Sequence, residues 1–329
     1  MKPAYSIQAF GGNIRGRVTR LEVTDGDGKE SDNATIEVDD RNASVALPAK
    51  GTPLSISMGY EGNLAHMGLF VVDDVETNGY PQKATITATA ADMTKEGKQP
   101  RNKGYEKKTI QDIAGEAAGR MGLAAEVSPS LASFLYEYRA QTAQSDMAFL
   151  SRIARDHGAV FKVADGKAIL TRWGEIWGGI VMVRGMLANG GDCIDYSGKA
   201  MARPGFSKFA ASWWDRDKVE EVKQEASGGG QSAEHLSTHH YPNEDEAQAA
   251  ADGKSDEKGS EEGGVHLTIV GRPGVRALMG LTVVGVRPGS VDGFWQIKTA
   301  THTIDDSGYV TSIDAGLPGK GGGGQGGTS

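Results

Sequence analysis

The sequence predicts an α+β protein that is mainly β, in which two antiparallel β regions flank a small α/β region. Short segments of alternating apolar and polar residues, separated by turn residues, fill residues 1–95 and return in residues 206–317. Between them, residues 96–172 contain two capped helix patterns and a hairpin pattern. A chain of 329 residues exceeds what one compact core usually holds, so two or three domains are expected.

Composition and charge exclude several classes of protein. Hydrophobic residues make up 38% of the chain and charged residues 24%, and no segment is apolar enough for stable membrane insertion. The net charge of −8 argues against free or sequence-specific binding to nucleic acid, which needs a basic face. Residues 1–7 contain no apolar run of secretory length, so we expect the protein to stay in the cytoplasm unless a larger assembly carries it out. The single cysteine, Cys193, cannot form an internal disulfide and is expected to be a buried or half-buried thiol.

The first β region contains five alternating segments that predict strands. They are Arg17–Val23, Ala34–Val38, Leu54–Tyr60, Gly68–Val72 and Ala84–Thr89. At this spacing, five short strands favour a small barrel or sandwich with one polar face. Between the first two, Asp25, Asp27, Glu30 and Asp32 could form a calcium loop, but the spacing fails at the third ligand and no helix flanks it. A hairpin turn is therefore favoured there.

Residues 93–108 are polar and are predicted to connect two domains, and a helix follows them. Thr109 can cap this helix, and Asp112 can answer from the third helical position. The apolar face of the helix consists of Ile110, Ile113, Ala114, Ala117 and Met121. Gly115 and Gly119 each cost a helix up to ~1 kcal/mol relative to alanine, so we expect a close contact with another backbone there.

The clearest pattern runs from residue 134 to residue 172. Residues 134–138 alternate like a strand, and residues 141–144 form a polar break. Ser145 can then cap a helix by accepting a hydrogen bond from a free backbone N–H, and Asp146 places a negative charge at the positive end of that helix. Gly158 supplies the left-handed residue that ends the helix, and residues 159–170 form a hairpin.

This second helix has one apolar face and one charged face. The apolar face consists of Met147, Phe149, Leu150, Ile153 and Ala154. Arg152 and Asp156 lie four residues apart on the opposite face and are expected to form a solvated pair.

Eight positions of this unit form a signature. They are Gln141, Ser145, Asp146, Phe149, Leu150, Arg152, Ile153 and Gly158. Their order closely resembles the late control gene D protein family of contractile-tailed phages and, more loosely, the hub part of VgrG proteins of type VI secretion. The resemblance runs from about residue 5 to residue 317 and is weakest between residues 173 and 205. It implies two related tube-type β-barrels joined by a small α/β domain, with three subunits placing six barrels in a ring between the sixfold tail tube and the threefold spike.

The expected domains follow from the β regions and the resemblance together. They are a first tube-like barrel in residues 1–95, an α/β domain in 96–172, a connection in 173–205, a second tube-like barrel in 206–317 and a disordered glycine-rich tail in 318–329. The connection holds one apolar strand, Ile180–Val183, among its glycines. Residues 244–262, with eight acids against two lysines, predict a solvated helix. Of the pair Trp213 and Trp214, one ring is expected in a core and the other at a subunit contact.

The expected function is that of a structural baseplate hub without enzymatic activity, cofactor or metal. Ser145, Asp156 and His157 lie on one helix, but residues 11 or 12 apart are separated by ~17 Å along its axis, too far for a catalytic hydrogen bond. His235, His239 and His240 lack a further ligand at a known metal spacing, so a polar strand end is favoured.

The resemblance also implies the partners. They are two further copies in a homotrimer, the tail spike protein, the tail tube or tube-initiating protein, the baseplate wedge proteins and the tape measure protein. The protein would be made and assembled in the host cytoplasm and would lie in the tail baseplate of the virion. A type VI delivery hub is the alternative with the same fold, and a tail-associated peptidoglycan hydrolase is the alternative of another class. The paired carboxylates of such a hydrolase cannot be singled out among 43 acids.

Overall fold

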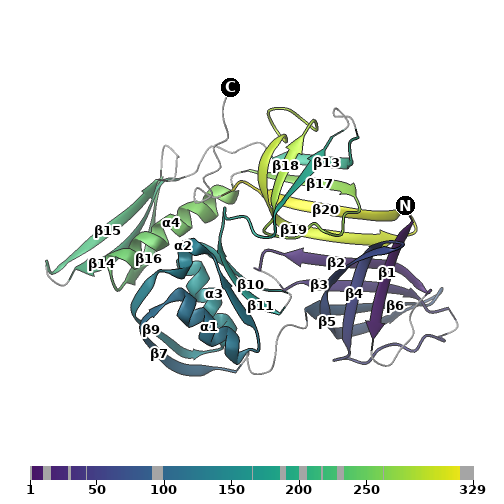
Figure 1. The fold of residues 1–329 in the computed structure, drawn as a ribbon, viewed down its shortest axis with the longest axis horizontal. Helices are drawn as coiled ribbons and strands as arrows, with labels where there is room; N and C mark the ends of the chain where they lie inside the picture. The colour runs from purple at the N-terminus through teal and green to yellow at the C-terminus, as the bar shows by residue number, and fades with distance from the viewer. Residues whose placement is uncertain are drawn as a thin grey trace.

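The chain folds into four parts, which we name by their residues (Figure 1). The computed structural model describes residues 2–9, 16–28, 31–41, 43–90, 99–164, 166–185, 190–199, 206–215, 218–227, 233–261 and 263–318. The first β module comprises residues 2–90, the α/β module residues 99–172, the arm residues 206–261, and the second β module residues 180–199 and 263–318. The chain is mainly β, as predicted, and none of the helices within the described ranges is long and apolar enough to cross a membrane.

Six antiparallel strands form the first β module. They are β1 Pro3–Ala9, β2 Val18–Gly26, β3 Asn33–Asp39, β4 Pro53–Tyr60, β5 Asn63–Asn78 and β6 Lys83–Ala90. Their order in the sheet is β1-β4-β5-β6-β3-β2. Leu21, Ile36, Leu54 and Ile86, from four different strands, are fully buried in the core. The five predicted strands are confirmed, but β1 was missed because it begins with a proline and brings few large apolar residues.

Six strands also form the second β module. They are β12 Ile180–Arg184, β13 Cys193–Lys199, β17 Gly264–Val270, β18 Gly280–Val284, β19 Gly293–Asp305 and β20 Gly308–Gly316. The expected connection in residues 173–205 is therefore wrong for β12 and β13. Glycines suggested a loop there, but two of them mark close backbone contacts. A Cβ on Gly185 would lie 2.1 Å from the carbonyl oxygen of Gly285, and a Cβ on Gly191 would lie 2.5 Å from that of Gly185. Cys193 is buried, as predicted.

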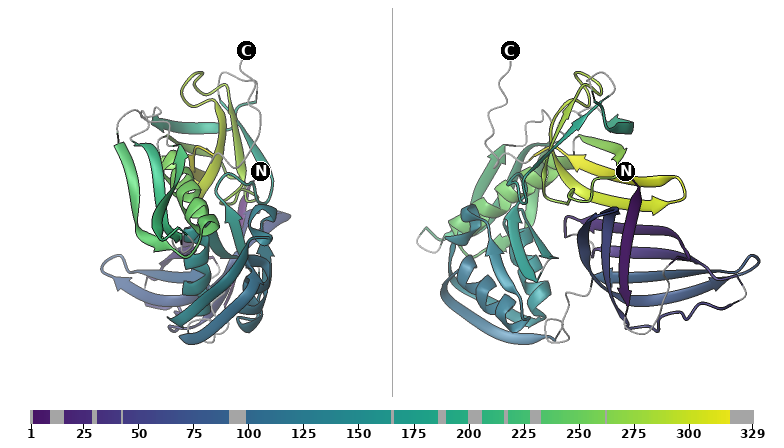
Figure 2. Two further views of the ribbon diagram at one scale, coloured as in Figure 1. Left: turned by 90° about the vertical axis from the view of Figure 1, so that its left-hand side faces the viewer. Right: turned by 45° about the vertical axis from the view of Figure 1, so that its right-hand side comes forward.

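The two β modules are joined strand to strand. β2 and β19 pair antiparallel, from Thr299 opposite Gly26 to Asp305 opposite Arg20. The result is one 12-stranded sheet that runs through both modules. Figure 2 shows β19 and β20, in yellow, lying across the first β module in the right-hand view. Each of these two strands thereby covers backbone groups that the other module would otherwise expose at an edge.

The α/β module packs three helices against two small sheets. Its elements are β7 Arg101–Thr109, α1 Ile110–Arg120, β8 Ala124–Val127, α2 Pro129–Ala132, β9 Leu135–Gln144, α3 Asp146–Asp156, β10 Ala159–Ala164 and β11 Lys167–Arg172. β7 pairs with β9, and the other sheet has the order β10-β11-β8. The capping box of Thr109 and Asp112 and the hairpin of β10 and β11 are present as predicted.

Three expectations for this module are wrong. Residues 101–108 belong to β7 and not to a connection, and residues 93–98 lie outside the described residues. Residues 141–144 continue β9 rather than break it. Both strands are polar because a single face of their two-stranded sheet packs on the core, through residues such as Tyr105 and Tyr136. Gly115 and Gly119 make no close backbone contact, since a Cβ at either position would meet nothing within 4 Å.

Residues 206–261 form an arm instead of part of a second barrel. β14 Phe206–Asp215, β15 Glu220–Ser227 and β16 Ala233–Tyr241 make a separate sheet in the order β15-β14-β16, and α4 Glu244–Glu261 lies along it (Figure 1). The expected solvated helix is wrong for one side of α4, where Ala247 and Ala251 are buried against the sheet. Trp213 packs against the same cluster, whereas Trp214 is 52% exposed.

Candidate functional site

Three of the signature residues, Gln141, Ser145 and Asp146, meet at the N-terminus of α3. The Ser145 hydroxyl accepts a hydrogen bond from the backbone N–H of Ala148 at 3.2 Å, which is the predicted cap. Asp146, the next residue, is fully buried. Burial of an unpaired carboxylate would be costly, so its partners decide whether this arrangement is stable.

Asp146 is held by two arginines and an amide. Arg120 donates to it through two nitrogens, at 2.5 and 3.1 Å, and Arg101 approaches to 3.0 Å. Gln141 donates from Nε2 at 3.0 Å. Burial alone would raise the pKa of Asp146, but the hydrogen bonds from Arg120 and Gln141 and the charges of both arginines outweigh it and hold that pKa below its ordinary value. Asp146 is thus more than a charge at a helix end, because it ties α1, β7 and β9 to α3.

The apolar signature residues fill the core beneath this ion pair. Phe149 is fully buried and stacks on Tyr105, with ring centroids 5.5 Å apart. Leu150 and Ile153 are buried beside it. On the other face, Arg152 donates to the carbonyl oxygen of Ala140 at 2.6 Å.

The expected solvated pair of Arg152 and Asp156 is wrong. Asp156 instead forms an ion pair with Arg139 of β9, and Arg139 also approaches Glu246 of α4. Tertiary neighbours from β9 replaced the local partner that helical spacing predicts. Glu246 therefore links the arm to the α/β module.

The last signature residue, Gly158, has two reasons to be glycine. Its φ of +59° is the left-handed conformation that ends α3. In addition, a Cβ on Gly158 would lie 2.0 Å from the Cα atom of Gly253, in the middle of α4. The backbones of α3 and α4 therefore meet at a pair of glycines. The contact at Gly253 was not predicted, although a glycine inside a helix is a signal for such a contact.

His157, which precedes this glycine, is a structural side chain. Its Nε2 lies 2.6 Å from the hydroxyl of Tyr136 in the buried core. Burial, together with the charges of Arg172 and Arg139, lowers the pKa of His157 to about 3, so the ring is neutral near pH 7. Ser145 lies at the opposite end of the helix, and the two do not form a nucleophile and base pair.

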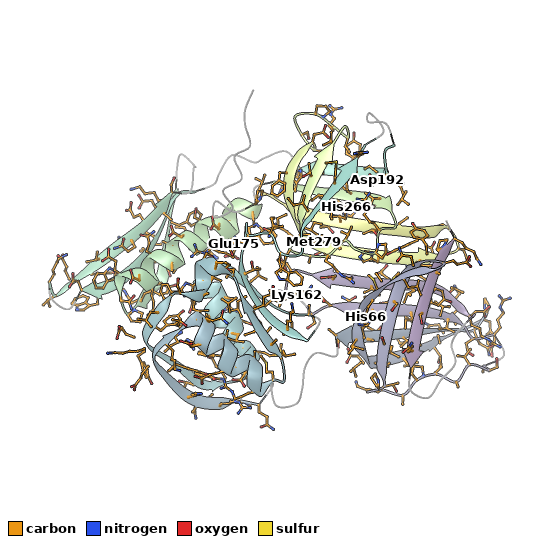
Figure 3. The ribbon with its side chains drawn as sticks, viewed as in Figure 1. His66, Lys162, Glu175, Asp192, His266 and Met279 are labelled. Atoms are coloured by element: carbon orange, nitrogen blue, oxygen red, sulfur yellow. The ribbon has the colours of Figure 1, made fainter. Side chains whose placement is uncertain are left out.

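A second cluster joins the α/β module to both β modules. Lys162 of β10 reaches the carboxylates of Asp25 and Asp32 in the first β module and donates to the carbonyl oxygen of Gly26 at 2.7 Å (Figure 3). Arg276, from the second β module, lies 3.7 Å from Asp25. The acids considered as calcium ligands therefore surround an ammonium group. Glu30, which belonged to that set, lies outside the described residues.

The segment that leaves the α/β module is fixed to the second β module. The indole N–H of Trp173 donates to the carbonyl oxygen of Leu317 at 2.9 Å. The side-chain amide of Gln296 accepts from the N–H of Gly174 at 2.7 Å and donates to the carbonyl oxygen of Glu175 at 2.9 Å. Gln296 is fully buried in β19, so these bonds position the whole segment.

In the part of the chain that the structure describes, no group of three His, Cys, Asp or Glu side chains is placed to hold a metal ion. His240 lies 2.9 Å from the Ser212 hydroxyl, and His235 lies beside the ring of Phe209. The side chain of His239 is outside the described set. The side chains described above can hold the modules together. Their titratable groups, such as Asp146, Asp156 and Lys162, form ion pairs and hydrogen bonds with one another and with the backbone.

Comparison with known proteins agrees with this architecture. The family model of the phage tail baseplate hub matches residues 29–308. The "probable baseplate hub protein" of Escherichia phage P2 is 34% identical over 165 residues, which are 50% of this chain and 43% of that protein. The chain thus matches less than half the length of that relative.

Solved structures show the same fold. A tail protein of prophage MuSo2 from Shewanella oneidensis superposes with a TM-score of 0.73 at 15% identity, over 96% of this chain and 99% of the other. An Escherichia coli component of the type VI secretion system superposes with a TM-score of 0.59 at 10% identity, over 95% and 76%. The resemblance found in the signature residues is confirmed by the family match. This chain belongs to the phage tail baseplate hub family.

Proposed function

We propose that this protein is the structural hub of a contractile phage tail, and that three copies form a ring between the sixfold tail tube and the threefold spike. The observation that supports this most directly is an internal repeat. The strand order β1-β4-β5-β6-β3-β2 of the first β module corresponds to β12-β18-β19-β20-β17-β13 of the second. All pairs in the two orders are antiparallel except that of β12 and β18, which is parallel.

The repeat extends to individual residues. In β5 the pairing shifts between Val72 and Asp74, and in β19 it shifts between Ile297 and Thr299, at the same place relative to the next strand. Each of the two strands also contains a glycine with nearly the same backbone angle, Gly68 with a φ of +151° and Gly293 with a φ of +149°. A buried aromatic residue follows two positions later in both, Phe70 and Trp295.

A repeat of this kind suits a ring. Within the chain, the β2 side of the first module contacts the β19 side of the second. The second module has a side equivalent to the β2 side, the first module has a side equivalent to the β19 side, and neither takes part in this contact. A heterologous contact between these two sides would join the second module of one copy to the first module of the next copy, in the same way as the two modules are joined within one chain. Three chains then supply six nearly equivalent modules, which matches a sixfold tube at one face while the chain itself repeats three times. The net charge of −8 suits a channel through which DNA passes, since like charges repel.

Partners and location follow from the same role. The spike protein would bind the threefold face, and the tail tube or tube-initiating protein the sixfold-like face. Baseplate wedge proteins would surround the ring, and the tape measure protein would end at it. The hub would be assembled in the host cytoplasm and become part of the virion baseplate.

The two alternatives have less support. A type VI delivery hub shares the fold, but the sequence matches are to phage baseplate hub proteins. A peptidoglycan hydrolase needs two carboxylates that flank the bond it cuts. Asp146, the one acid of the signature, is buried and held by arginines and is therefore not suited to that role.

The proposal is tested by the mass of the purified protein and by imaging of the tail tip. We expect a particle of three 34.6 kDa chains, and a ring with six similar densities on one face. A stable monomer inside the particle, or a true hexamer, would contradict it.

A further inference from the structure

The long strand β5 has neighbours on both sides along only part of its length. Its residues 63–71 pair with β4, and residues 70–78 pair with β6. On the side of β4, no described strand of the chain pairs with residues 74–78. The corresponding half of β19, residues 299–305, is covered on that side by β2. The position beside residues 74–78 of β5 is therefore open, whereas the equivalent position beside β19 is occupied by β2.

Side-chain exposure reflects this difference. Glu76 and Thr77 of β5 are exposed. The shift in pairing aligns them with Thr301 and His302 of β19, of which Thr301 is half-buried and His302 fully buried. Residues 74–78 of β5 therefore correspond to a part of β19 that has a strand on each side, but their side chains are as exposed as those of an edge strand. Natural proteins usually cover an edge of this kind.

β13 is the strand that corresponds to β2, and it lies at the far end of the 12-stranded sheet. Among the described strands it pairs only with β17, so its other edge is open. Tyr196 of β13 is 43% exposed, whereas its counterpart in β2, Leu21, is fully buried. In Figure 1, β13 and β5 lie in different modules on either side of the joined strands β2 and β19.

We propose that β13 of one copy pairs antiparallel with residues 74–78 of β5 in the next copy. This inference rests on the proposed trimer and specifies its contact. The register of β2 on β19, transferred through the repeat, places Ser197 opposite Asn78, Gly198 opposite Thr77 and Lys199 opposite Glu76. We call this contact the β13–β5 seam.

The seam joins strands that fit each other in charge. Lys199 and Glu76 stand directly opposite one another with opposite charges, and both are exposed in the single chain. Opposite charges across an antiparallel pair stabilise it, and like charges destabilise it. Each copy contributes β13 to one seam and β5 to another. The contact therefore repeats from copy to copy, and the ring closes when the third copy meets the first.

Cysteine cross-linking of the full chain tests the register. In a Cys193→Ser background, Asn78→Cys combined with Ser197→Cys should give covalent dimers and trimers on mild oxidation, reversed by reductant and with no larger species. Neither single-cysteine variant should give a covalent trimer. Glu22→Cys combined with Thr303→Cys is the matched control, because those side chains lie 3.3 Å apart on the equivalent pair within the chain, and it should cross-link without raising the mass. Asn63→Cys with Ser197→Cys, at the other end of β5, should not cross-link.

Charge reversal provides an independent measurement. Glu76→Lys or Lys199→Glu should weaken trimer association by roughly fivefold per seam, and the double reversal should restore it. A trimer that forms without the Asn78–Ser197 cross-link, or single reversals that the double variant does not rescue, would overturn the seam and leave the hub proposal standing. Protein that stays monomeric at all concentrations, without a cross-link, would overturn both.

Discussion

The contact between Gly158 and Gly253 can be tested by a single methyl group. In Gly253→Ala, the new Cβ would lie 2.3 Å from the backbone nitrogen of Gly158 and 2.6 Å from its Cα atom. These are backbone atoms and cannot rotate away, so α4 must shift from α3. Overpacking of this kind costs roughly 1–3 kcal/mol. Alanine would at the same time favour a helix by up to ~1 kcal/mol over glycine. We expect an overpacking cost near ~3 kcal/mol. After the gain in helix propensity is subtracted, the free energy of unfolding should fall by about 2 kcal/mol.

A matched control lies in the same helix. A Cβ on Gly259 would meet nothing within 4 Å, so Gly259→Ala should stabilise the protein by about 0.5–1 kcal/mol. Urea unfolding followed by circular dichroism gives both free energies, and hydrogen exchange of α4 shows whether the change is local. If Gly253→Ala were as stable as Gly259→Ala, the close approach of α3 and α4 would not exist in solution.

Three further predictions concern the core, the charged junction and the lack of catalysis. Phe149→Ala should cost roughly 3–5 kcal/mol of stability and Ser145→Ala about 1, as measured by thermal or urea unfolding; an unchanged stability for Phe149→Ala would place α3 outside a core. At the junction, burial raises the pKa of Asp32 from 3.8 to about 6, against the attraction of Lys162. The fold therefore favours the protonated carboxyl, and this contribution is fully present below pH ~4 and is lost as the pH rises through about 6. Wild-type stability relative to Asp32→Asn should accordingly fall by roughly 2–3 kcal/mol between those pH values, and a flat difference in urea unfolding would refute this. Finally, the purified protein should not clear peptidoglycan in a zymogram or contain stoichiometric zinc by elemental analysis, and a positive result in either would favour an enzyme.

The sequence was most informative where local rules and tertiary packing agree. The caps at Thr109 and Ser145 depend on bonds made within one turn, so they could be predicted from spacing alone. Asp146 was predicted to lie at the helix end, but its arginines come from residues 101 and 120, and no local pattern indicates them.

Other errors arose where neighbours override local preference. β7 and the second half of β9 are polar because only one face of their sheet is buried, and they were read as a connection and a break. The arm was missed because alanines form its helical contact with the sheet, and they produce little contrast between the faces of α4. The repeat was visible in principle, since Gly68-Leu-Phe-Val-Val72 and Gly293-Phe-Trp-Gln-Ile297 share a glycine and an aromatic residue at the same spacing.

The pairing of β2 with β19 has a consequence for synthesis of the chain. β2 is made about 270 residues before residues 299–305, which cover it. At ~5–20 residues per second, this interval lasts roughly 15–60 s. The first β module can meanwhile fold around its own core with β2 bare at one edge. Nascent chains and truncated products therefore expose the edge of β2 to one another. We expect misassembly to begin between neighbouring nascent chains on the same mRNA.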